Sequence, residues 1–409
     1  MPPGVGEPGV GTTTWEGRRK GKAFVSSGPP PSRRAAAPAR LRRPLLAEVR
    51  SPLSPVSLRS LPQVGSKLEW PRLPLGSRSV RSPGAGEREA KVLAWLLEHD
   101  QPAVRYRALV DLLDRKESDR TVREARAEIP RVGWAADQLR AQGPKGYWEK
   151  REPRNVLEWF KFLWQPMYRA TIWRALVLSD LGLDSKDARV RRTAEVLMDY
   201  KLRFSSPINF YYEEMCMVGN TARMLTRFGY GEDRRVLKLY DWMLEDQRRD
   251  GGWNCSQDSP GTLDAWEPMA AFAAVPKRRR SSEMERAIER GAEFYLKRRL
   301  FQEGSRYAPW FRLHYPRHYF YDILVGLEFL TELGFSDDRR LRPALEILRK
   351  KRRADGTWWM EALHPDVGAG PKNSAESPRE RPLVIERPGR PSKWITLKAL
   401  TVLKRAGAA

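Results

Sequence analysis

Four residues of this sequence have types and spacings that could support chemistry: His318, Asp322, Cys255 and Cys216. His318 and Asp322 are four positions apart, so on a helix they would share one face and their side chains would meet. An aspartate can fix the tautomer of a neighbouring imidazole, which would make this pair a general base or a metal-ligating unit. Cys255, as ligand or nucleophile, and Cys216 would extend the pair to a zinc site. The alternative is a histidine with ordinary partners and two small buried cysteines.

Aromatic and basic residues supply the candidate substrate contacts. Arg169 would orient an anionic head group through bidentate hydrogen bonds. Aromatic rings present apolar faces to an isoprenoid chain, and their quadrupoles stabilise a carbocation. The alternative is that aromatic residues at helical spacing only fill the core. The aromatic candidates are Trp173, Tyr212, Trp266, Tyr319 and Trp394.

Carboxylates keep a second chemistry open. Carbohydrate-cleaving enzymes use two carboxylates about 5–10 Å apart. Glu213 and Glu214 are adjacent, and neighbouring residues on a helix point about 100° apart, so they cannot form such a pair themselves. One of them would have to face Asp264, with Glu267 nearby in the sequence.

These residues must be positioned by helices. From about residue 86 apolar residues recur every three or four positions, as in "KVLAWLLEHD" and "LVGLEFLTELGF", and strand-like alternation is rare. We therefore predict an all-α fold of six helical hairpins, closed into an (α/α)6 toroid; an open solenoid is the alternative. The first, more polar helices are expected near 86–99, 119–142, 186–201, 232–248, 281–301 and 337–352. The second, more apolar helices are expected near 102–114, 167–182, 213–229, 263–275, 318–334 and 393–406.

In such a ring the loops that enter the apolar inner helices gather at one end. Residues that begin these helices should then converge on the mouth of a central cavity. Both cysteines and two of the four histidines, His314 and His318, belong to this set. One or two inward-facing arginines on or near these helices could bind a diphosphate. The candidates are Arg105, Arg107, Arg169, Arg174, Arg223 and Arg312.

A repeated motif supports the hairpins. "QGPKGYW", "QRRDGGW" and "RRADGTW" end at Trp148, Trp253 and Trp358, which are 105 residues apart in each step. Two hairpins per step give a unit of about 50 residues, a period typical of repeat architectures. A second marker recurs before the polar helices, where a Gly suits a left-handed C-cap and Asp187, Asp233 or Asp337 suits an N-cap or first turn.

The Gln-x-x-Asp-Gly-x-Trp pattern resembles the repeat of the protein prenyltransferase and squalene cyclase superfamily. The resemblance covers about residues 86–409 and extends to "YPRHYFYDILVGLEFLTELG" and "GRPSKWITLKALTVLKR". It implies an α/α toroid in which the Gln caps the following helix and stacks on the Trp. Gln142, Gln247 and Arg352 occupy that position here.

The sequence also departs from this superfamily. The Asp-x-Asp-Asp acid of the cyclases is absent: "FSDDRR" has Phe335 at the first position and lies where a helix cap is expected. The magnesium-binding Asp-Asp-x-x-Asp is absent too. The zinc ligands of the prenyltransferases include Asp-x-Cys, whereas Trp253 stands two residues before Cys255. The resemblance therefore predicts a fold more specifically than a reaction.

Composition separates the N-terminal fifth from the rest. Residues 1–85 hold 15 Lys and Arg against 4 Asp and Glu, within a chain of formal net charge +24. Rich in Pro, Gly, Ser and Arg, this tail cannot bury enough apolar surface to fold, and we expect it to be disordered. It could contact anionic lipid or nucleic acid, or be upstream sequence translated from a misplaced start. We see no secretory signal and no transmembrane run, and two cysteines imply no disulfide framework, so a cytoplasmic location is expected.

The leading functional expectation is a prenyltransferase- or terpene-cyclase-like protein that binds, and in its catalytic form transforms, an isoprenoid or other apolar ligand. The ligand would occupy the central cavity. No sequence-specific nucleic-acid binding is expected, and peripheral membrane contact is allowed. Two alternatives remain: a non-catalytic helical-repeat scaffold, which predicts a filled barrel, and a helical-barrel carbohydrate-active enzyme.

Overall fold

The computed structural model of this protein describes residues 85–149, 171–203, 215–255, 259–302, 307–318, 320–363 and 383–408. All of them belong to one unit, Pro71–Ala409. The predicted tail lies outside the described residues except for Ala85. Three predicted ligand contacts, Arg169, Tyr212 and Tyr319, also lie outside them, as do Glu213 and Glu214.

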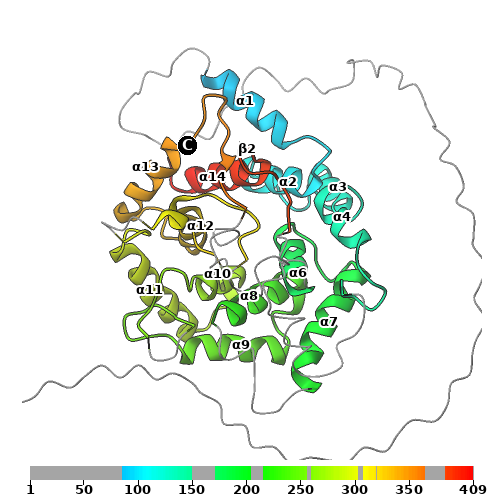
Figure 1. Ribbon diagram of the computed structural model, residues 1–409, viewed down its shortest axis with the longest axis vertical. Helices are drawn as coiled ribbons and strands as arrows, with labels where there is room; N and C mark the ends of the chain where they lie inside the picture. Colours follow the sequence, from blue (N-terminus) through cyan, green and yellow to red (C-terminus); the bar gives the residue numbers. More distant parts are fainter. Residues whose placement is uncertain are drawn as a thin grey trace, which may run out of the picture. The chain divides into compact units, whose positions relative to one another are not determined.

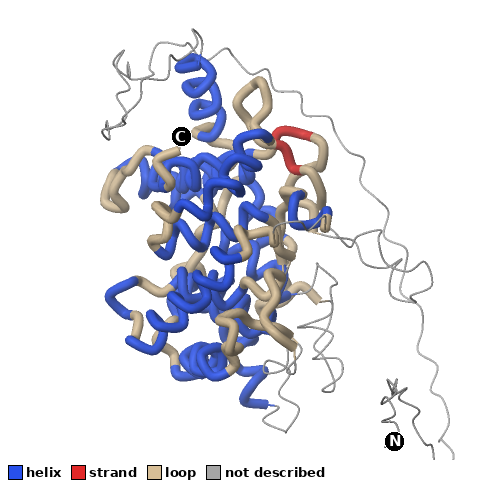
Figure 2. The backbone as a smooth tube through the Cα atoms, turned by 90° about the vertical axis from the view of Figure 1, so that its left-hand side faces the viewer, coloured by secondary structure: helices blue, strands red, loops and turns tan. Residues whose placement is uncertain are grey.

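The described chain is mainly helical, as predicted, with one short strand pair (Figure 2). The more polar helices are α1 (Ala85–Leu96), α3 (Arg120–Glu128), α4 (Gly133–Arg140), α7 (Ala188–Arg203), α9 (Arg234–Glu245), α11 (Ser282–Lys297) and α13 (Arg342–Lys350). The more apolar helices are α2 (Pro102–Arg107), α6 (Thr171–Asp180), α8 (Met215–Leu225), α10 (Glu267–Ala274), α12 (Ile323–Leu333) and α14 (Lys393–Arg405). Short helical turns extend three of these elements or join them: η1 (Ala108–Leu112) after α2, η2 (Thr226–Tyr230) after α8, η3 (Lys277–Arg279), η4 (Ala308–Phe311) and η5 (Arg339–Leu341) before α13. Strands β1 (Trp359–Met360) and β2 (Arg390–Pro391) pair antiparallel.

Two predicted helices have different bounds in the structure. The predicted helix 119–142 is two helices, because Pro130 lacks a donor for a continuous helix and Gly133 has a φ of +74°. The predicted helix 318–334 begins only at Ile323. This later start changes the interpretation of His318, as described below.

From α6 onward the apolar helices contact one another in chain order, whereas α2 is linked to α6 through the polar helix α4. α6 packs on α8, α8 on α10, α10 on α12 and α12 on α14. The last helix, α14, then packs on α2 and η1 near the beginning of the described chain, and Figure 1 draws α14 and α2 side by side. The apolar helices are buried almost all round, whereas α9 buries one stripe formed by Val236, Leu239, Tyr240 and Met243. This difference follows from their composition, since a helix that is apolar on every face is stable only when other elements cover it.

The repeated tryptophan motif forms the same clamp three times. The indole N–H of Trp148, Trp253 and Trp358 donates to the carbonyl ten residues earlier, at 2.8, 2.8 and 2.7 Å. Two residues before each Trp, a glycine adopts a φ of +91°, +90° or +90°, which a residue with a side chain would adopt only with strain. The identical geometry confirms that these segments are copies of one structural unit.

The glutamine of the motif links two polar helices. Gln247 Nε2 donates to the carbonyls of Gly251 at 2.8 Å and of Ala287, inside α11, at 2.9 Å. Gln142 Nε2 reaches the carbonyl of Arg189 in α7 at 3.2 Å. The glutamine thus joins the end of its own helix to the following polar helix, at a carbonyl of the first turn for Gln142 and of the second turn for Gln247. In the third copy the Arg352 guanidinium lies 5.3 Å from the Trp358 ring centroid.

The helix caps follow the predicted pattern with one shift. Asp187 and Asp233 accept backbone N–H bonds from Arg189 and Arg235 at 2.8 and 2.9 Å. In the third copy Asp338, rather than Asp337, is the cap, with a 2.8 Å bond from the N–H of Arg340. Among the described helices, none combines the length and apolar composition needed to span a membrane.

Candidate functional site

A buried histidine–aspartate pair lies at the start of α12. His314 Nδ1 is 3.0 Å from Asp322 Oδ2, and neither side chain is exposed. The same nitrogen lies 3.1 Å from the carbonyl oxygen of Arg312. Because both neighbours are acceptors, the neutral imidazole carries its proton on Nδ1 and its lone pair on Nε2. His314 Nε2 has no hydrogen-bond partner among the described residues, so it is the atom that a ligand would meet.

Asp322 is fixed by the backbone around it. Its Oδ1 accepts the N–H of Val325 at 2.9 Å as the N-cap of α12, and its Oδ2 accepts the N–H of His314 at 3.3 Å. A carboxylate at this position is also favoured by the positive end of the helix dipole. One residue thus both begins an apolar helix and orients the imidazole.

The predicted pairing of His318 with Asp322 on one helical face is wrong. Helix α12 begins at Ile323, so both residues precede it and the four-residue spacing does not align them. The imidazole that Asp322 holds belongs to His314, eight residues earlier. No helical periodicity links residues 314 and 322, so spacing alone could not identify this pair.

His318 lies in the same buried region. Its backbone has a φ of +50°, and its carbonyl accepts a 2.8 Å bond from Asn220 Nδ2 of α8. Its ring meets the predicted ligand contact Trp173 edge-on, with 5.1 Å between ring centroids. Burial, together with the nearby His314 and Arg223, lowers the pKa of His318 to about 3. His318 is therefore neutral at physiological pH.

The neutrality of His318 predicts a specific loss of stability in acid. Its unfolded pKa is near 6.5 and its folded pKa is about 3, so protons bind preferentially to the unfolded chain between these values. Stability should fall as pH decreases through this range, by about 1.4 kcal/mol per pH unit from this group. We expect His318→Asn, which tolerates positive φ, to remove that part of the slope in urea unfolding at pH 7.5, 5.5 and 4.5. His99→Asn, at an exposed position, is the control; an unchanged slope in His318→Asn would contradict the prediction.

A close approach of α8 to α10 buries a second acidic residue. A Cβ at Gly219 of α8 would lie 2.6 Å from the Cβ of Glu267, so only glycine permits this packing. Glu267 is the first residue of α10 and is fully buried. Burial raises the pKa of Glu267 well above its usual range, and the neighbouring Cys255 raises it further. Neither carboxyl oxygen has a hydrogen-bond partner within the described part of the chain.

Arg223 connects the two buried groups. Its guanidinium lies 5.1 Å from the ring centroid of the predicted contact Trp266, and its Nη2 donates to Asn220 at 2.9 Å. Electrostatic coupling joins Arg223 both to Glu267 and to His318. We use the name mouth cluster for His314, Asp322, His318, Asn220, Arg223, Trp266 and Glu267.

The predicted zinc site is not assembled from the described residues. Cys255 is half-buried beside Glu267, and Cys255 and Cys216 are not joined in a disulfide. No group of three or more His, Cys, Asp or Glu side chains in the described ranges has a geometry that could hold a metal ion. The donor set therefore does not fit zinc, and no step below depends on a metal.

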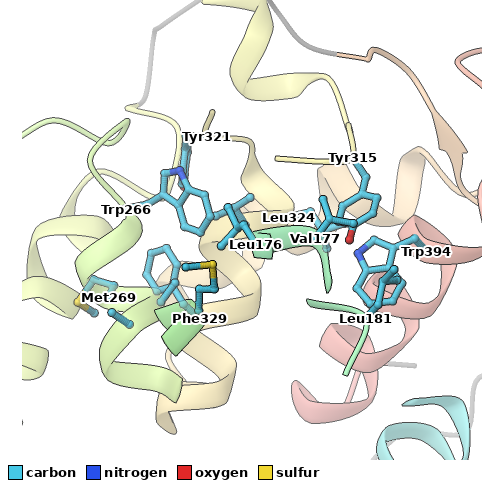
Figure 3. Packing of buried hydrophobic residues seen from close by; sticks show 14 of the residues in the cluster. Leu176, Val177, Leu181, Trp266, Met269, Tyr315, Tyr321, Leu324, Phe329 and Trp394 are labelled. Atoms are coloured by element: carbon cyan, nitrogen blue, oxygen red, sulfur yellow. The ribbon is translucent and has the colours of Figure 1, made fainter. Parts of the chain in front are cut away.

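The predicted aromatic contacts are buried but do not form one surface. Trp173, Trp266 and Trp394 are each only 1% exposed. Trp394 stacks near Tyr315, with 5.0 Å between ring centroids. Figure 3 shows Trp266 and Trp394 on opposite sides of the cluster, with Leu176, Val177 and Leu324 between them. Apolar side chains thus fill the space between the described apolar helices, and the two grooves the structure describes lie elsewhere, beside α1 and between α9 and α11.

The sequence placed these residues unevenly. His314 was among the residues expected to begin an apolar helix, Arg223 was one of several arginines on or near these helices, and Glu267 was noted only as a carboxylate near Asp264; no spacing distinguished any of them from their neighbours. No sequence pattern pointed to Asn220 as a site residue, apart from its position one helical turn before Arg223. A contact between α8 and the loop before α12 joins residues about 100 positions apart, which a local pattern does not encode.

Neither a protein-family model nor a curated protein sequence matches this chain. The class of protein is therefore defined by the structure alone. It is an all-α repeat protein with a buried cluster of titratable side chains at the starts of α10 and α12 and in the second half of α8.

Proposed function

We propose that residues 86–409 form an (α/α)6 toroid of the prenyltransferase and squalene cyclase type that binds an isoprenoid or other apolar ligand in the cytoplasm. The order of contacts between the apolar helices, with α14 returning to α2, supports a closed ring. The three equal tryptophan clamps support the repeat that the resemblance implies. The mouth cluster combines residues at the starts of α10 and α12 with Asn220 and Arg223 from the second half of α8, and we expect a ligand to bind beside it.

In its catalytic form the protein would transfer a proton to or from this ligand. The observation that carries this proposal is the His314–Asp322 pair, buried and aligned at 3.0 Å. Asp322 keeps the neutral imidazole in the tautomer that offers Nε2 as the proton acceptor, and stabilises the imidazolium that then forms. His314 thereby replaces His318 as the proposed base, and Cys255, beside Glu267, remains the candidate nucleophile.

The test is incubation of the full chain with prenyl diphosphates and with squalene in D2O, without added metal. We expect a product that carries deuterium, because the proton that His314 Nε2 accepts exchanges with solvent and the imidazolium then returns a deuteron to the ligand. His314→Asn should lower its rate by about 10²–10⁴-fold while ligand binding persists, because only the proton acceptor is lost. His99→Asn is the matched control. Absence of both binding and product with the wild-type protein would remove this proposal.

A non-catalytic helical-repeat scaffold is the second candidate. The filled space between the described apolar helices favours it, because Leu176, Val177 and Leu324 occupy the region between Trp266 and Trp394. In that case the same assay would give neither product nor binding of the apolar probes. The carbohydrate alternative has one favourable observation, since exposed Asp264 is coupled electrostatically to buried Glu267. This alternative predicts that the wild type hydrolyses a glycoside and that the Glu267→Gln variant does not.

A further inference from the structure

Three neighbouring side chains of the mouth cluster have polar atoms without partners among the described residues: Arg223 Nε, Trp266 Nε1 and the carboxyl oxygens of Glu267. The three side chains are at most 4% exposed. Arg223 lies against the Trp266 ring, and Glu267 follows Trp266 in the chain. A buried donor without an acceptor costs about 1–3 kcal/mol, so the N–H groups of Arg223 and Trp266 call for an acceptor.

The local charge balance specifies the sign of that acceptor. Asp180 Oδ1 lies 2.5 Å from Arg227 Nη1 and 3.8 Å from Arg223 Nη1, so one carboxylate serves two guanidinium groups. Burial raises the pKa of Glu267, the next acid beside Arg223, well above its usual range and so favours the uncharged carboxyl. With Glu267 uncharged, two guanidinium groups share the single charge of Asp180, and one positive charge is left without compensation.

The neighbouring cation Arg317 does not change this count. Its guanidinium pairs with Glu328, which is also 3.6 Å from Lys398, and it is coupled to Asp322 as well. The uncompensated positive charge is therefore that of Arg223, whose Nε has no partner among the described residues.

The donor types select the chemical class. A guanidinium edge binds a planar two-oxygen anion in the bidentate geometry typical of carboxylates. The indole N–H donates a further bond, and an uncharged carboxyl donates its O–H, which makes a strong bond to a carboxylate oxygen. A single negative charge matches the single surplus charge, whereas a phosphate or diphosphate would exceed it.

We propose that the ligand at this site carries a carboxylate, and that Arg223, Trp266 and Glu267 bind it. The assignment rests on the proposed function for the apolar part of the ligand. Cys255 beside Glu267 is half-buried and Asp264, two residues before Trp266, is exposed, so we expect the carboxylate to enter from this side, with its chain near the aromatic residues.

Calorimetric titration of the full chain with dodecanoate and with dodecanol tests the head group at constant chain length. We expect dodecanoate to bind the wild type about tenfold tighter or more, as charge-assisted hydrogen bonds require. Trp266→Phe should reduce this preference several-fold, and Arg223→Met should abolish it. Arg286→Met, on the exposed face of α11, should leave it intact. Arg223→Lys keeps the charge and should retain part of the preference, which distinguishes lost binding from misfolding.

Equal affinity of the wild type for the two probes, or an undiminished preference in Arg223→Met, would overturn the carboxylate assignment and leave the apolar-ligand proposal standing. Failure of the wild type to bind either probe would remove the proposed function. The carboxylate is then tested alone, by thermal unfolding in sodium acetate, sodium phosphate and sodium chloride at equal ionic strength. A rise of the midpoint specific to acetate, lost in Arg223→Met, supports the site. If acetate gives no such rise, only water meets these donors and the carboxylate assignment is overturned. A rise with phosphate alone overturns it as well.

Discussion

Replacement of Asp322 by alanine should lower the free energy of unfolding by about 2–4 kcal/mol, because it removes a helix N-cap and leaves buried donors without an acceptor. Asp322 accepts the backbone N–H groups of Val325 and His314 and faces His314 Nδ1, with no exposure of either side chain. Alanine leaves all these donors buried without an acceptor and removes the N-cap of α12. Urea unfolding monitored by far-UV circular dichroism measures the loss.

Asp338→Ala is the matched control, because Asp338 is also an N-cap aspartate but has a side chain that is 23% exposed. Loss of such a cap should cost about 1 kcal/mol. The difference between the two variants isolates the pairing with His314. Equal losses would show that Asp322 acts as an ordinary cap and would contradict the proposed pair.

Asp322→Asn separates orientation from stability. The asparagine oxygen can still cap α12, but its amide would offer an N–H to His314, which favours the opposite tautomer. The expected readout is a change in the ¹⁵N shifts of the His314 imidazole, from protonated Nδ1 in the wild type to protonated Nε2 in the variant. Retention of the wild-type tautomer would argue against control by the Asp322 carboxylate.

Glu267→Gln should make the protein more stable than the wild type at neutral and alkaline pH. A carboxyl whose folded pKa is raised loses its proton more readily in the unfolded chain, so wild-type stability declines as pH rises above the unfolded value near 4.5. The decline should be about 1.4 kcal/mol per pH unit until pH reaches the folded pKa. Glutamine is neutral at every pH and nearly isosteric, so it lacks this slope.

Unfolding in urea at pH 5, 6, 7 and 8 measures the difference. We expect the stability advantage of Glu267→Gln to grow steadily over this range. The control Glu289→Gln makes the same substitution at an exposed position of α11 and should change stability little. A wild type that keeps or gains stability toward pH 8 relative to Glu267→Gln would show that Arg223 holds Glu267 ionised. The surplus charge at Arg223 would then disappear, and with it a premise of the carboxylate assignment.

The two predictions test the two halves of the mouth cluster independently. Asp322 and His314 belong to the segment that leads into α12, whereas Glu267 and Arg223 lie at the interface of α10 with α8. Asn220 and His318 are the link between them, through one 2.8 Å hydrogen bond. Additive effects of the two substitutions would indicate that this link carries little coupling.

The sequence by itself determined the helical fold, the alternation of polar and apolar helices and the repeated clamp. These features are local: helical periodicity is encoded within about two turns, and Gly251 with Trp253 forms its turn with residues at most ten positions away. The helix caps at Asp187 and Asp233 are local in the same sense. In the third copy the cap is Asp338 instead of the predicted Asp337, so the pattern located this cap to within one residue.

Only the tertiary structure decided which chemical groups meet. The four-residue spacing suggested His318 for Asp322, but α12 starts too late for that spacing to apply, and the loop before it turns His314 onto the carboxylate instead. Burial of Glu267 depends on the absent side chain of Gly219, and the neighbours of Arg223 come from α6, α8 and α10. Burial and charge compensation are properties of the assembled interface between distant segments, and for that reason no pattern within a single helix could specify them.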